Sequence, residues 1–186
     1  MTVIDDYTFY KCEKVKSISL GSGVTTIGKY AFYGCKELKS LSIPESVVSI
    51  GKLAFRNASE VKSLVIYDTL ATIENYAFYN WKNVTFYVVS STAGENWGER
   101  WNSSHRPVVW GVTLSDEGYV VSFTKTATSF DNFNDKTVVN GPERAGYTFA
   151  GWTSVQGGAV EYTASNVVNA PDGTVLYAVW KVAITE

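Results

Sequence analysis

The first half of the chain repeats itself with a constant period, and this period restricts the fold more than any other feature. A hexapeptide of the type Ile-Gly-Lys-Tyr-Ala-Phe recurs in four versions, and consecutive versions begin 23 residues apart. The four versions begin at Ile4, Ile27, Ile50 and Ile73. One coil of this length cannot bury its own apolar face, whereas stacked coils bury it against each other. We therefore predict a mainly β solenoid with short helical turns, made of four coils over residues 4–89.

The apolar residues inside each unit recur in columns, which predict the orientation of the side chains. The pattern Leu38-x-x-Leu41-x-Ile43 indicates a short strand in which Leu41 and Ile43 point inward and Ser42 points outward. A column of phenylalanines predicts an aromatic spine through the stack, formed by Phe9, Phe32, Phe55 and Phe78.

Residues 27–44 read I-G-K-Y-A-F-Y-G-C-K-E-L-K-S-L-S-I-P. This segment resembles the repeat of the BspA-type leucine-rich repeat proteins. The resemblance implies a leucine-rich repeat solenoid from a family of surface or secreted proteins, found mostly in bacteria and in some parasitic protists. These proteins are implicated in adhesion and in binding to host or matrix. The resemblance therefore implies a binding module that needs no cofactor.

The chain departs from the repeat after the fourth unit. Residues 90–111 carry Trp97 and Trp101, which are four residues apart and would share one face of a short helix. A solenoid needs a cap over its open end, and we predict that this segment is the C-terminal cap. Since no matching N-terminal cap is present, we expect the stack to belong to a longer array.

Residues 112–186 have a different pattern, with alternating strands and glycine-rich turns. The motifs G-Y-T-F-A-G-W at 146–152, G-G at 157–158 and L-Y-A-V-W at 176–180 resemble a Listeria-Bacteroides repeat. This resemblance implies a small β-grasp-like α+β domain that serves as a spacer or as an accessory adhesion module. We predict two domains, 1–111 and 112–186.

Several function classes are excluded by composition and motif content. A net charge of −2 argues against a nucleic-acid binder with a basic surface, and the apolar runs are too short for membrane insertion. The chain lacks the common nucleophile, metal and phosphate motifs, and His105 is its single histidine. We expect no enzymatic activity, no metal and no cofactor.

Cys12 and Cys35 occupy the same repeat column. Stacking would bring their Cα atoms within reach of a disulfide, which the spacing does not exclude. Because Ala58 and Trp81 hold this place in later coils, we expect free thiols that serve as small buried apolar groups.

Two sets of residues are candidates for partner binding. The first consists of tyrosines flanking the Ala-Phe pair of each coil, which either pack between coils or form an exposed strip: Tyr7, Tyr10, Tyr30, Tyr33, Tyr76 and Tyr79. The second lies on the outer face of the strands, where the 23-residue spacing predicts a ladder of serines in the early coils: Ser17, Ser19, Ser40, Ser42 and Ser63. The candidates on this face are Ser42, Val65, Phe86 and Val88. The apolar members of this face form either an exposed patch or a docking surface for the second domain, and we expect docking.

A column of lysines, Lys16, Lys39 and Lys62, either splays apart or pairs with Glu37 and Glu60.

The functional hypothesis is a non-enzymatic, extracellular interaction or adhesion module of a larger bacterial surface protein. Its partner would be a host or matrix protein or a glycan, and the chain itself is expected to be monomeric. The alternative is a structural spacer or stalk with no ligand of its own.

Overall fold

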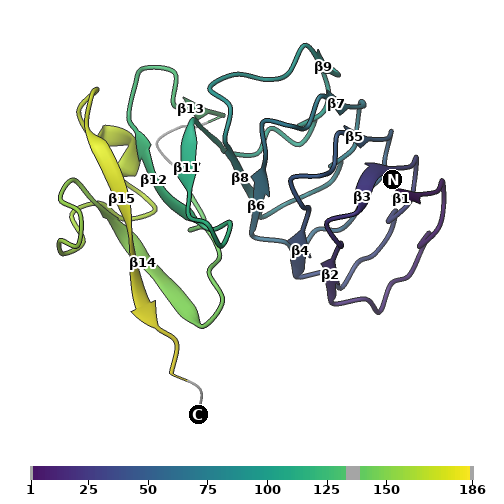
Figure 1. Cartoon of the computed structure of the whole chain (residues 1–186), viewed down its shortest axis with the longest axis horizontal. Helices are drawn as coiled ribbons and strands as arrows, with labels where there is room; N and C mark the ends of the chain where they lie inside the picture. Colours follow the sequence, from purple (N-terminus) through teal and green to yellow (C-terminus); the bar gives the residue numbers. More distant parts are fainter. Residues whose placement is uncertain (1, 133–138, 185–186) are drawn as a thin grey trace.

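The computed structural model describes residues 2–132 and 139–184. The first half of the chain winds into stacked coils, and the C-terminal part, green to yellow in Figure 1, lies beside the last coils. Coils one to four begin at Ile4, Ile27, Ile50 and Ile73. The predicted fold class, a mainly β leucine-rich repeat solenoid, is confirmed by parallel pairing of strands 23 residues apart.

Two ladders of short parallel strands run along the stack. The first ladder contains β1 (Thr2–Ile4), β3 (Val24–Ile27), β5 (Ser49–Ile50), β7 (Thr72–Ile73) and β9 (Asn96–Trp97), in this order. The second ladder contains β2 (Ser17–Ser19), β4 (Ser40–Ser42), β6 (Ser63–Ile66), β8 (Thr85–Val88) and β10 (Val108–Trp110). This second ladder is interrupted, because β2 and β4 form one sheet and β6, β8 and β10 belong to another.

The turn that follows each isoleucine is hydrogen-bonded to the same turn of the next coil. The amide of Phe32 donates to the carbonyl of Ala54 at 2.8 Å, and the amide of Phe55 donates to the carbonyl of Ala77 at 2.9 Å. Each turn holds one residue with positive φ directly before its Ala-Phe pair, which is Thr8-Phe9 in coil one: Tyr7, Tyr30, Leu53 and Tyr76, with φ between 57° and 65°. This backbone conformation aims alternate amides at the neighbouring coil.

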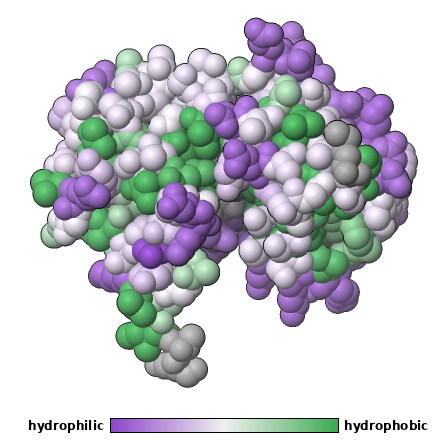
Figure 2. Space-filling view, viewed as in Figure 1, coloured by the Kyte–Doolittle hydropathy of each residue, from purple (hydrophilic) through white to green (hydrophobic). Residues whose placement is uncertain are grey.

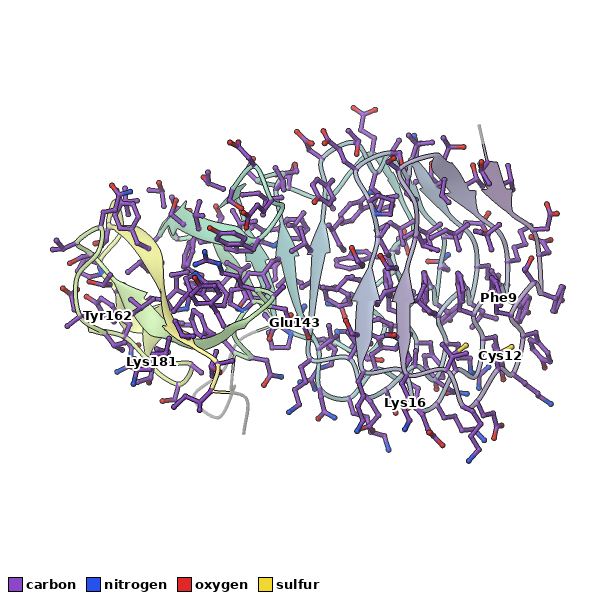
Figure 3. The ribbon with its side chains drawn as sticks, turned by 60° about the horizontal axis from the view of Figure 1, so that its bottom comes forward. Phe9, Cys12, Lys16, Glu143, Tyr162 and Lys181 are labelled. Carbon is purple, nitrogen blue, oxygen red and sulfur yellow. The ribbon has the colours of Figure 1, made fainter. Side chains whose placement is uncertain are left out.

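The phenylalanine column forms the predicted spine. The rings of Phe9, Phe32, Phe55 and Phe78 stack with centroid distances of 5.0, 5.1 and 5.7 Å. Phe32, Phe55 and Phe78 are buried, whereas Phe9 at the free end of the stack is 39% exposed. Figure 3 shows Phe9 and Cys12 at this end, far from Tyr162 and Lys181 of the C-terminal part.

The segment predicted to be the C-terminal cap forms a fifth coil. β9 pairs with β7 and β10 pairs with β8, both in parallel. The expected helix is absent from 90–111, and among the described residues the one helix is η1 (Val167–Asn169). Trp101 takes the place of the small alanine of earlier coils, since its amide donates to Gly98 as that of Ala54 does to Gly51. Its indole packs on Phe78 and Phe86 and closes the core at this end.

The fourth coil is one residue shorter on its strand side, which corrects our assignment of two outward residues. Leu64 pairs with Phe86 and Ile66 pairs with Val88, so the spacing here is 22 and not 23. A one-residue shift exchanges the two faces of a strand. Phe86 and Val88 therefore point into the solenoid core, where both are fully buried, and Tyr87 takes the outward position. Val88, and not Val89, continues the inner column of Ile43 and Ile66.

The C-terminal part is built on a four-stranded antiparallel sheet with η1 as its short helical element. The sheet contains, in order, β11 (Val112–Leu114), β12 (Val120–Thr124), β15 (Val175–Val182) and β14 (Tyr147–Thr153). A further strand, β13 (Phe130–Asp131), pairs with β10 of the solenoid. One sheet thus holds strands from both sides of residue 111, and the division into domains 1–111 and 112–186 stays a prediction.

The C-terminal part packs on the outer face of β8 and β10. Tyr87 and Val109 are buried in the same apolar cluster as Phe123 and Trp152. The Tyr87 hydroxyl donates to the carbonyl of Asn140 at 2.6 Å, and burial raises the pKa of this phenol well above its usual value. The second core is therefore anchored on the end of the first.

Candidate interaction surfaces

The strand face of the first two coils is a flat row of short hydroxyl side chains. Ser17 and Ser19 on β2 and Ser40 and Ser42 on β4 are all exposed, in the register that the sequence predicts. We name these four residues the serine face. Serines let the backbone of another molecule approach closely, because no long side chain stands in between.

The rest of the strand face is not free. Val65 lies on the outer side of β6 and packs against the apolar cluster of the C-terminal part. Ser63 and Thr85 are buried. Of the four strand residues chosen from the sequence, Ser42 is thus exposed and Val65 lies at the junction, while Phe86 and Val88 lie inside the solenoid.

The six candidate tyrosines form two stacked rows on the turn side of the coils. Tyr7 stacks on Tyr30 at 4.9 Å and Tyr10 stacks on Tyr33 at 5.1 Å, while Tyr76 meets Tyr79 edge to face at 5.9 Å. Tyr7, Tyr10 and Tyr79 are exposed and the other three are half-buried. The rows thus combine both of the roles weighed from the sequence, inter-coil packing and exposure.

Two arginines complete these rows, and the sequence analysis did not single them out. The guanidinium of Arg56 lies between Tyr33 and Tyr79, 5.4 and 4.9 Å from their ring centroids, and fills the tyrosine place of coil three. Arg100 lies over Tyr76 and donates to its hydroxyl. A repeat alignment would have shown Arg56 in the column of Tyr33 and Tyr79. Because most ring faces are covered by a neighbour, the rows present ring edges and hydroxyls rather than aromatic platforms.

A cleft lies beside the junction of the solenoid and the C-terminal part. Figure 2 shows the notch between the two lobes. Its first hollow, of about 140 Å³, is lined by β4, β6, Tyr67, Gly118 and Glu143. Its second hollow, of about 500 Å³, lies between Tyr67 and the loop after β11. Tyr67 and Gly118 line both hollows, so the two hollows adjoin each other. No motif in the sequence predicts this cleft, because the cleft depends on how the C-terminal part is placed.

Gly118 is needed where the two parts approach each other. Its φ is +82°, and a Cβ at this position would lie 2.8 Å from the hydroxyl oxygen of Tyr67. Burial, with a smaller contribution from Glu45, raises the pKa of Tyr67. The phenol therefore stays protonated across the neutral range.

The electrostatics of the cleft differ from those of the coil surface. Glu143 keeps access to solvent, yet neighbouring protein atoms raise the pKa of its carboxyl, and Lys62 partly offsets this effect. On the coils, Lys14 pairs with Glu37 at 3.2 Å and Lys36 pairs with Glu13 at 2.7 Å. Of the two alternatives for the lysine column, pairing with Glu37 and Glu60 is not found among the described residues, because Glu37 pairs with Lys14. Lys16, Lys39 and Lys62 form no ion pair with any described residue.

The groups that would be needed for chemistry are dispersed. Cys12 and Cys35 are free thiols, and burial raises the pKa of Cys35 to about 11, which makes it a poor nucleophile. Cys35 Sγ lies 3.7 Å from the carbonyl oxygen of Phe9, and the indole of Trp81, in the same column, donates to the equivalent carbonyl of Phe55. In residues 2–132 and 139–184, no three His, Cys, Asp or Glu side chains are grouped so as to hold a metal ion. No helix in the same residues has the length and apolarity to cross a bilayer.

Comparison with known families agrees with the two resemblances. The model of the BspA type leucine rich repeat region, in six copies, matches residues 1–96. The model of the Listeria-Bacteroides repeat domain matches residues 112–179. Neither the curated proteins nor the solved structures compared with the chain contain a match. Repeats of both types are typical of bacterial surface proteins.

Proposed function

We propose, since the chain belongs to the BspA-type leucine-rich repeat family, that it is a non-enzymatic interaction module of a bacterial cell-surface or secreted protein. Its role is adhesion, and its partner is a host or matrix protein or a glycan outside the cell. The chain works as a monomer, because the coils and the C-terminal part supply each other's packing.

The observation that carries this proposal is the exposed serine face. Ser17, Ser19, Ser40 and Ser42 lie on strands held rigidly by parallel pairing, and they lead directly into the cleft beside the C-terminal part. A rigid surface loses little conformational entropy when a partner binds. The tyrosine rows are the second surface available to a partner, and their phenols supply contact area with few torsions to freeze.

A substitution experiment separates the two surfaces. The double variant Ser19→Arg/Ser42→Arg places long side chains on the serine face, and Tyr10→Ser/Tyr79→Ser removes exposed rings from the turn side. Each is compared with the unaltered chain on an array of matrix proteins and glycans. Binding lost in the first variant alone supports the serine face, and binding lost in the second alone assigns the partner to the tyrosine rows.

A structural spacer is the second candidate function, and one observation favours it. The C-terminal part is joined to the coils by β13 and by the Tyr87 contact with Asn140, so the chain forms a stiff joint. If the unaltered chain binds nothing on the array but still displays a larger distal domain at the cell surface, the adhesion proposal is wrong and the spacer is favoured.

A further inference from the structure

We propose that the cleft between the coils and the C-terminal part binds an extended polypeptide segment of the partner through its Lys or Arg side chains. This inference rests on the proposed interaction function and names the chemistry of the partner. The larger hollow takes the cationic side chains, and the smaller hollow beside the serine face takes the main chain.

The larger hollow has an apolar floor that suits an aliphatic stem. Val89 of the solenoid and Leu114 of β11 line it, together with Val112 and Tyr67. Val89 and Leu114 are half-buried, so part of their surface is available to a ligand. Lys and Arg bury their methylene stems on surfaces of this kind while the charged group stays near water.

The rim of the same hollow is acidic. Glu45 and Asp68 stand on the solenoid side and Asp116 stands on the loop after β11, and all three are exposed. No Lys or Arg is among the residues that line this hollow. The rim therefore attracts a cation and repels an anion.

The arrangement of these carboxylates distinguishes a peptide from a metal ion. They do not converge, since no group of three His, Cys, Asp or Glu side chains in the described residues could hold a metal. A single divalent ion needs converging oxygen ligands, whereas separate cationic side chains along a peptide need separate carboxylates. Dispersed acids over an apolar floor fit the peptide.

The smaller hollow suits the main chain of such a segment. It is lined by Ser40 and Ser42 on β4 and by Ser63 on β6, at the place where the strand ladder is interrupted. Ser40 and Ser42 are exposed, and their hydroxyl groups can donate hydrogen bonds to peptide carbonyls and accept them from peptide amides. Because these side chains are short, an extended backbone can lie close to the strand face. Glu143, beside the solenoid strands in Figure 3, adds a fourth carboxylate here.

The test uses a fluorescein-labelled decapeptide of alternating Lys and Gly. Fluorescence anisotropy measures the binding of this peptide to the full chain. The comparison peptide carries 2,4-diaminobutyric acid in place of Lys, which keeps the charged amino groups but shortens each stem by two methylene groups. We expect the Lys peptide to bind at least about tenfold more tightly, because only its side chains span the apolar floor and reach the rim.

Two matched double variants locate the binding. Asp68→Asn/Asp116→Asn removes two charges from the cleft, and Glu95→Gln/Glu99→Gln removes two from an exposed loop of the fifth coil. We expect the dissociation constant of the Lys peptide to rise about tenfold in the first variant and less than twofold in the second. Thermal melting of both variants checks that the fold is retained.

Three outcomes would overturn the proposal: no binding of the Lys peptide, equal affinity for the short-stemmed peptide, or equal weakening by the two variants. The last two would indicate general charge attraction. If the Lys peptide fails while the chain still binds a matrix protein or glycan on the array, the cleft inference falls and the proposed function stands. If the Lys peptide binds as expected and the array is silent, the cleft assignment stands and adhesion fails.

Discussion

The solenoid and the C-terminal part are held together in opposite ways. In the coils one contact recurs: an amide of a phenylalanine donates to an alanine carbonyl one coil further on, and the rings stack in the same column. At the junction each contact occurs once, as with the Tyr87 hydroxyl on Asn140 and the Trp110 indole on Asp131 at 2.8 Å. In the coils, the same contact repeated in every unit determines how neighbouring coils align, so no single contact is essential. At the junction, individual residues determine how the C-terminal part is placed.

Inserting a residue in β8 should have the largest effect. An alanine inserted between Phe86 and Tyr87 turns Tyr87 inward and Val88 outward, which removes both the docking anchor and part of the coil core. We expect the free energy of unfolding to fall by at least about 4 kcal/mol, measured by urea denaturation with tryptophan fluorescence.

The control is a lysine inserted between Val84 and Thr85. Coil four lacks a counterpart of Lys62 at this point, since Thr85 pairs directly with Ser63. This insertion restores the 23-residue spacing without moving the strand, and we expect a cost below about 1 kcal/mol. Equal costs for the two insertions would contradict the register described for β8.

Truncating the aromatic spine tests the redundancy of the coils. Phe55→Ala leaves a cavity between Phe32 and Phe78 in the middle of the stack, and we expect a loss of about 3–5 kcal/mol. Phe9→Ala at the free end should cost less than half as much, because Phe9 is already 39% exposed. Calorimetry of both variants checks this ratio, and similar losses would mean that the free end is more tightly packed than described.

A smaller effect is expected where the coils approach most closely. A Cβ on Gly51 would lie 2.7 Å from the amide nitrogen of Lys29, so Gly51→Ala forces two backbones apart. We expect a loss of about 1–3 kcal/mol in urea denaturation. Gly21→Ala is the control, because no atom lies within 4 Å of its Cβ position and its φ is not positive. It should leave stability unchanged or slightly raised.

The smallest change concerns the hydrogen bond at the junction. Tyr87→Phe keeps the buried ring but removes the hydroxyl that donates to Asn140, and we expect the free energy of unfolding to fall by about 1 kcal/mol.

The unaltered chain should melt in one transition, since strands from both sides of residue 111 share a sheet. Two separate transitions in the unaltered chain would show that the junction contributes little. Tyr10→Phe, at an exposed position, should change the melting temperature by less than Tyr87→Phe does.

The period of the sequence was sufficient to predict the coils, the phenylalanine spine and the serine face. It did not predict the outward residue of β8, because constant spacing was carried past the point where coil four loses a residue between Val84 and Thr85. The pair Trp97 and Trp101 does pack together, at 5.0 Å, but on a strand and turn of a fifth coil rather than on a helix. Both errors lie where the constant 23-residue spacing of the sequence ends.

The candidate surfaces were predicted unevenly for a related reason. The tyrosine columns follow from the repeat, since equal positions in stacked coils must be neighbours. The cleft does not, because Tyr67 and Gly118 are 51 residues apart in sequence and meet only after the C-terminal part has docked. Contacts that occur once leave no periodic trace.

Trp101 stands where Ala31, Ala54 and Ala77 stand in the earlier coils, and this limits where a repeat unit could be duplicated in the chain. A copied 23-residue unit placed between coils two and three would meet the same alanine, glycine and phenylalanine contacts on both sides. After Trp101 the same copy would meet an indole where it needs a methyl group. Recombination within the array would thus extend the serine face by about 4.8 Å per unit, while the cleft and the joined C-terminal part are inherited unchanged. The architecture therefore combines a solenoid whose length can vary with a C-terminal part that stays the same.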